Sequence, residues 1–262
     1  MKRTISRYSV ETPPTKGVKK GVMQQQREIA VTLSPTRITS ALLAAAVVMG
    51  IAATAVQWLA RLTGNKPFFG LVRLLHLEEE ANLPTAFSVL LLALASLLLA
   101  VISWNERRAA NANATHWIVL TVGFCLMVLD EFAMLHEMMS GPGKRVLGNG
   151  TLGPLFFTWV LPAFFGLAAI AIYFVPFLRQ LPRHVMYRFV SAGAVYVAGC
   201  VGLEMLGGMR FEQFGRDPLY LAFATFEELM EMTGVVLFIR ALIHYLSETA
   251  PDLRLSFRFS ST

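Results

Sequence analysis

The sequence predicts an all-α protein, a polytopic integral membrane helical bundle with about six transmembrane helices. Only 15% of the 262 residues are charged, whereas soluble domains carry about 25%, and 55% are hydrophobic. Apolar stretches of about 20 residues recur along the chain, the length that an α-helix needs to cross a hydrocarbon layer of about 30 Å. Open sheets are excluded, because lipid cannot satisfy unpaired backbone groups.

Three regions follow one another along the chain. Residues 1–38 predict a disordered, basic cytoplasmic arm, since they hold eight Lys and Arg against two Glu and show no helical apolar period. A transmembrane domain is expected over 39–247 and a cytoplasmic tail over 248–262. The expected spans are 39–60, 84–104, 116–139, 155–178, 189–210 and 219–245.

The segment "KPFFGLVRLLHLEEEANLP", residues 66–84, separates the first two spans. Its apolar residues between Phe68 and Leu75 fall at helical spacing, which predicts an amphipathic helix in the membrane interface. This helix ends in His76 and three consecutive Glu, just before Pro84 opens the next span. The segment is either a lid that supplies His76 or a Glu to a site, or a solvated loop.

The Lys and Arg residues orient the bundle. One side of the expected topology holds 15 of them and the other side seven, which places both termini in the cytoplasm and the protein in the inner membrane. The net charge of +6 is interpreted as a means of attracting the basic arm to anionic lipid headgroups. The expected partner is therefore the lipid bilayer and not nucleic acid. Cys125 and Cys200 lie inside expected spans and form neither a disulfide framework nor a CxxC metal signature.

Acidic residues interrupt three of the expected spans at one level of the membrane. At a rise of 1.5 Å per residue, they fall within roughly 3–18 Å of the same membrane face. Within 116–139, Asp130 and Glu137 are seven apart and are expected to face the bundle, with neighbouring ionisable groups reaching adjacent clefts. The candidate site residues are Asp130, Glu131, His136, Glu137, Glu204, Glu227, Glu228 and Glu231.

Neutralising these acids requires protons or bound cations. A charged residue at the centre of a transmembrane helix costs about 2.5–3.5 kcal/mol, and His136 is the only basic residue within the spans at this level. Carboxylates with one or two histidines suit hard or borderline metals, so we expect a transition metal at these residues: iron, manganese or zinc. The Glu-x-x-His pair of bundle di-iron sites is missing, because Ala133 stands three residues before His136. Methionines at the same level leave copper as a less favoured metal.

The segments "LDEFAMLHE", "EEEANLPTAFS" and "EELMEMTG" resemble a group of uncharacterised bacterial multipass membrane proteins with an LDExxxxHE segment and an EExxEM helix. The resemblance covers roughly residues 68–245. It implies no reaction, and it implies only that these acids belong to one site. Intramembrane CAAX-type proteases also carry paired Glu in a helix, but Met232 departs from their EExxxR pattern, which excludes that family.

Three functions are compatible with an acidic site of this kind. The leading hypothesis is a metal-dependent membrane enzyme, redox or hydrolytic, acting on a lipid-like or quinone-like apolar small molecule; its catalytic residues stay unknown. The alternatives are a cation- or proton-coupled transporter and a non-catalytic membrane assembly factor in which protonated acids hold helices together. A carrier needs a path to both faces. The inner halves of the expected spans hold only Arg240 and His244, and this one-sidedness favours the enzyme.

Overall fold

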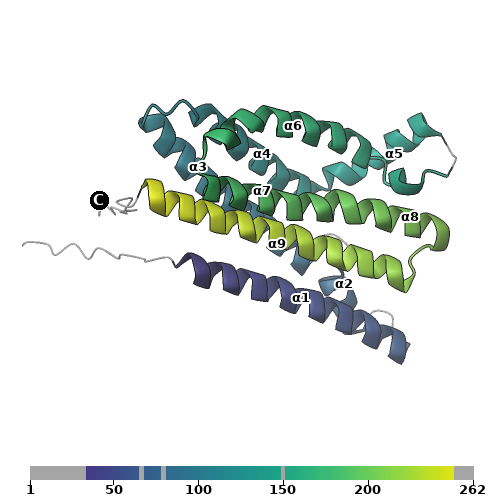
Figure 1. Ribbon diagram of the computed structural model, residues 1–262. Helices are drawn as coiled ribbons and strands as arrows, with labels where there is room; N and C mark the ends of the chain where they lie inside the picture. The colour runs from purple at the N-terminus through teal and green to yellow at the C-terminus, as the bar shows by residue number, and fades with distance from the viewer. Residues whose placement is uncertain (1–33, 65–67, 78–80, 149–150, 251–262) are drawn as a thin grey trace, which may run out of the picture. The chain divides into compact units, whose positions relative to one another are not determined.

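The computed structural model describes residues 34–64, 68–77, 81–148 and 151–250 (Figure 1). Within these ranges every regular element is a helix, which confirms the predicted all-α fold. Residues 1–33 of the expected arm and 251–262 of the expected tail lie outside the described part. Residues 35–38 of the expected arm already belong to the first helix.

Within the described residues, six helical segments are long and apolar enough to cross a membrane, as the sequence predicts. Five of them are α1 (Pro35–Thr63), α3 (Leu83–Arg108), α4 (Ala114–Ala133), α6 (Val160–Gln180) and α9 (Pro218–Thr249). The sixth, Arg183–Phe214, consists of α7 (Arg183–Val197), the π-helical turn η3 (Ala198–Leu203) and α8 (Glu204–Phe214). Shorter elements connect them: η1 (Phe68–Gly70), α2 (Leu71–Leu75), α5 (Leu135–Leu147) and η2 (Gly153–Leu155).

Three of the long helices begin with a capping side chain followed by proline in the first turn. Ser34, Asn82 and Asp217 each accept a hydrogen bond from a backbone N–H of that turn. The cap satisfies a donor that has no intrahelical partner, and proline is tolerated there because its missing N–H is not needed. Local sequence thus sets where α1, α3 and α9 begin.

Helix α9 contributes most to the packing of the described bundle. It contacts α1, α3, α7, η3 and α8, and Figure 1 shows it alongside α1 and alongside α7 and α8. Its side chains Val236, Ile239 and Leu242 are fully buried. Gly234 brings α9 close to Tyr196, since a Cβ on this glycine would lie 2.7 Å from the Cβ of Tyr196. Small residues of this kind let transmembrane helices approach closely.

The outward faces of the helices are apolar. On α6, Phe164, Phe165, Ile170 and Ile172 are each more than half exposed. A continuous apolar surface of this kind is unfavourable in water and favourable against lipid tails. The exposed surface therefore agrees with a membrane location.

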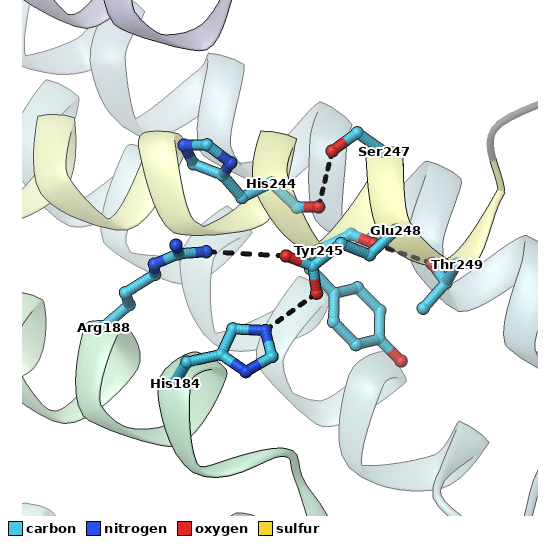
Figure 2. A network of polar contacts seen from close by, with 7 residues as sticks. All are labelled: His184, Arg188, His244, Tyr245, Ser247, Glu248 and Thr249. Atoms are coloured by element: carbon cyan, nitrogen blue, oxygen red, sulfur yellow. Dashed lines mark hydrogen bonds and ion pairs between the residues drawn. The ribbon is translucent and has the colours of Figure 1, made fainter.

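At one end of the bundle, an ion-pair network joins α7 to the last turns of α9 (Figure 2). His184 Nε2 lies 2.9 Å from one carboxylate oxygen of Glu248, and Arg188 lies 3.7 Å from the other. These groups are about half exposed, so the network contributes little to stability. It marks this end of α7 and α9 as polar.

The expected span 116–139 is confirmed as far as residue 133 and is wrong from residue 134 onward. Helix α4 ends at Ala133, Met134 adopts a left-handed conformation with φ of 54°, and α5 starts at Leu135. Asp130 and Glu137 therefore do not stack on one continuous helical face. Asp130 instead caps the start of α5.

The segment between α1 and α3 also contains a shorter helix than the sequence predicts. The expected amphipathic helix is split into η1 and the five-residue α2, because Phe69 and Gly70 have φ of 58° and 80°. His76 is 8% exposed, so it does not belong to a solvated loop. The three consecutive Glu that follow, 78–80, lie outside the described residues.

Candidate functional site

Asp130 and His136 form a pair across the α4–α5 junction. One oxygen of Asp130 accepts a hydrogen bond of 2.8 Å from the backbone N–H of His136, and the other lies 3.0 Å from His136 Nδ1. The left-handed Met134 turns the chain so that both contacts form. A carboxylate on Nδ1 favours the tautomer that carries its proton there, which leaves Nε2 of a neutral imidazole as the proton acceptor.

Trp159 connects this pair to α8. The edge of the His136 ring meets the Trp159 ring, with centroids 5.0 Å apart. The indole Nε1–H of Trp159 donates a hydrogen bond of 2.9 Å to Glu204 Oε1. Trp159 directly precedes α6 and Glu204 is the first residue of α8, so one side chain ties three elements together.

Glu204 and Glu227 form a carboxyl–carboxyl contact between α8 and α9. Their side chains lie close enough to interact directly. Since an ionised carboxylate only accepts hydrogen bonds, a hydrogen bond between the two would require that one of them carries a proton. The strongest electrostatic interactions of Glu227 are with other acids, namely Glu204, Glu231 and Glu228. The two carboxyl groups therefore form an acidic pair surrounded by further acids.

Glu131 and Glu231 line a small cavity beside this pair. Its volume is about 10 Å³, and Tyr196 and Ser88 supply further polar groups to its wall. A polar cavity of this size holds about one water molecule. The cavity joins side chains from α3, α4, α7 and α9.

The close approach of η3 to α9 positions the acids. A Cβ on Gly199 would lie 3.0 Å from the backbone oxygen of Glu227 and 3.3 Å from Cγ of Glu231. The absence of a side chain lets the π-helical turn pack directly on the acidic turn of α9. Single π-helical turns inside α-helices occur frequently at functional sites.

The structure gives fewer contacts for the remaining two candidates, Glu228 and Glu137. Glu228 interacts electrostatically with Glu227 and Glu231. Glu137 belongs to α5, and its side chain lies outside the described part of the structure. The structure thus brings the acids of α4, α8 and α9 to one level, and it links His136 to them through Trp159.

Residues 39–246 match a family described as a domain of unknown function (DUF8692). The chain belongs to the DUF8692 family. No curated protein and no solved structure matches it. The match agrees with the expected relationship to uncharacterised proteins, and it covers all eight candidate site residues.

The DUF8692 bundle offers no evident metal site among the residues described. No group of three or more His, Cys, Asp or Glu side chains is arranged there to hold a metal ion. The acids instead contact one another in pairs or interact with Trp159, Tyr196 and His136. The expected transition metal stays a prediction.

A second buried polar network was missed by the sequence analysis. Glu106 is 4% exposed, and its carboxylate accepts hydrogen bonds of 2.8 Å from the Tyr245 hydroxyl and 2.5 Å from the Asn111 amide. The Trp117 ring packs against the ring of the same tyrosine, with centroids 4.7 Å apart. The expected span ended at residue 104, whereas α3 continues to Arg108 and buries this acid. The halves of the spans opposite the carboxyl pair therefore do hold an acid, contrary to the prediction.

Helix α3 carries a buried polar face between the two networks. Ser88 lines the small cavity at one end, and Glu106 lies 18 residues further, about 27 Å along the helix. Ser96 and Ser103 are buried between them, and the Ser103 hydroxyl lies 2.8 Å from the hydroxyl of Thr121 on α4. The signal in the sequence is the recurrence of serine at near-heptad spacing within an apolar span.

Proposed function

We propose that this DUF8692 protein is a proton-coupled membrane carrier whose proton-binding site is the Glu204–Glu227 pair. The observation that carries the proposal is the direct interaction of the two carboxyl groups, with further acids around them. Two like charges in contact in a medium of low dielectric cannot both ionise, so the pair takes up a proton. Ionisable residues inside transmembrane segments are the usual components of proton relays.

The surroundings of the pair favour protons over a metal ion. The charges that face it are acids or weak acids, and protonation neutralises them without a fixed coordination geometry. They are Glu228 and Glu231 on α9 and Cys200 on η3. The basic side chain of His136 on α5 is linked to the pair through Trp159.

The buried polar face of α3 supports a carrier over a one-sided site. It leads from the small cavity beside Glu231 to Glu106, near the far end of the span. Serine hydroxyls along it offer donors and acceptors in an otherwise apolar interface. A carrier requires access to its site from both faces.

A pH jump on protein adsorbed to a solid-supported membrane tests the proposal. Proton binding inside the membrane moves charge and produces a transient current, even without a co-transported substrate. We expect this current from the unmodified protein, and its loss in Glu204→Gln and Glu227→Gln. Glu248→Gln is the matched control, because it removes an acid that is ion-paired at the exposed end of α9.

Two results would contradict the carrier. Absence of a transient current from correctly folded protein rules out proton binding within the membrane field. A current that survives both substitutions of the pair assigns the proton to another group. The polar face of α3 predicts a second access route that ends at Glu106. We expect Glu106→Gln to abolish the current when the pH is changed on the side of the membrane nearer Glu106, and to leave the current intact when the pH is changed on the opposite side.

A membrane enzyme is the second candidate, favoured by the Asp130–His136 pair. A carboxylate that fixes the imidazole tautomer is the arrangement of a general acid–base histidine. The substrate would be a lipid-like or quinone-like molecule that reaches His136 from the bilayer. Turnover of such a molecule by purified protein, lost in His136→Gln while the pH-jump current persists, would favour this function.

A further inference from the structure

A cavity of about 440 Å³ lies between α5 and the start of α6. This volume falls in the range of about 300–1,000 Å³ that is typical of small-molecule sites. One lining residue, Val146, is 85% exposed, so the cavity opens at the surface. Its lining consists of Met139, Pro142, Gly143, Val146, Leu147, Thr158, Leu161 and Pro162.

The wall of the cavity is held by close packing. A Cβ on Gly143 would lie 2.0 Å from Oγ1 of Thr158, so α5 contacts the α6 side directly at this glycine. The Thr158 hydroxyl is itself bound, since it donates a hydrogen bond of 2.8 Å to the backbone oxygen of Ser140. The only polar side chain of the lining is thereby satisfied, and the cavity presents an apolar surface. Apolar cavities exclude water and accept apolar ligands.

Two cationic residues stand next to the lining residues in the sequence of α5. Lys144 and Arg145 lie in the last turn of α5, beside the lining residues Gly143 and Val146. The Lys144 ammonium is 3.9 Å from the centre of the Phe156 ring. Glu212, an acid near the same loop, has both oxygens occupied by backbone N–H groups of residues 152 and 153 at 2.8 Å. An apolar cavity beside two cations matches a ligand with an apolar tail and an anionic head.

We propose that this cavity binds one acyl chain of an anionic membrane lipid, with the headgroup at Lys144 and Arg145. Such a lipid enters from the bilayer, and each cation near a headgroup contributes to its attraction. Trp159 lies in the chain between the lining residues Thr158 and Leu161, so the bound chain is adjacent to the residue that joins His136 to Glu204. The proposal does not depend on proton transport.

Quenching of Trp159 fluorescence by brominated lipids tests this site. Trp58 and Trp104 are more than half exposed on the outer surface and are replaced by Phe, while buried Trp117 is kept. The same protein with Trp159→Phe supplies the background. We expect bromine-labelled phosphatidylglycerol to quench Trp159 saturably at low mole fraction, with at least about fivefold higher affinity than bromine-labelled phosphatidylcholine.

Variants separate a specific site from the general lipid surface. Val146→Phe fills the cavity and should abolish the saturable quenching, whereas Val48→Phe, on the exposed face of α1, should leave it unchanged. Lys144→Gln with Arg145→Gln should remove the preference for the anionic lipid. Quenching that rises linearly with mole fraction and is equal for both lipids would overturn the proposal. Saturable quenching that persists in Val146→Phe would overturn it as well.

Discussion

Replacing Gly234 by alanine tests how closely α7 must pack against α9. The added Cβ would lie 2.7 Å from the Cβ of Tyr196 and 2.8 Å from its backbone nitrogen. Because backbone atoms are involved, rotation of a side chain cannot relieve the clash, and the helices must separate toward the ~3.5 Å optimum for non-bonded carbon atoms. Overpacking costs about 1–3 kcal/mol, and alanine regains about 1 kcal/mol of helix propensity. We expect a net loss of about 1 kcal/mol, and at most about 2 kcal/mol, in the free energy of unfolding.

The measurement is unfolding of the purified protein in mixed micelles with increasing denaturing detergent. Gly193→Ala is the matched control, because this glycine lies on α7 and a Cβ there meets nothing within 4 Å. It should be neutral or stabilising by up to about 1 kcal/mol. If Gly234→Ala proves as stable as Gly193→Ala, the close packing of α7 on α9 described above is refuted.

Three further predictions concern single groups. Arg210 hydrogen-bonds Asp217 and holds the pKa of that carboxyl below its ordinary value of 3.8. The ionised Asp217 carboxylate therefore stabilises the folded protein at pH values above 3.8, and this stabilisation is lost as the pH falls through the lower pKa of the folded state. Asp217→Asn should accordingly weaken the dependence of unfolding on acid pH. Tyr245→Phe should cost about 1–3 kcal/mol, because buried Glu106 loses a hydrogen-bond donor, and thermal unfolding in detergent measures this. Elemental analysis should find metal on only a small fraction of purified chains if protons neutralise the acids, whereas a stoichiometric metal would restore the metal-enzyme hypothesis.

The six spans could be predicted because their length and apolarity are local properties. The break at Met134 could not, since methionine and leucine both favour helices and no glycine or proline marks the turn. It depends on Asp130 reaching forward to the N–H of His136. That contact converts an expected acidic face into a capped junction.

The sequence predicts the depth of the candidate site residues in the membrane, and it does not predict which of them contact one another. The depth of Glu204 and Glu227 follows from counting residues along each helix, but their pairing depends on how α8 rotates against α9. Glu106 was assigned to a loop because it follows the apolar run. Its burial depends on Tyr245, which is 139 residues away in the sequence.

The π-helical turn Ala198–Leu203 has a consequence for how the family can change. Such a turn holds one residue more than an α-helical turn with the same ends. Each residue advances an α-helix by about 100°, so deleting one residue here would swing Glu204 by that angle away from Glu227. The carboxyl pair would then be lost without any substitution of an acid. Chain length between α7 and α8, as much as amino-acid identity, therefore determines whether a lineage keeps its paired acids.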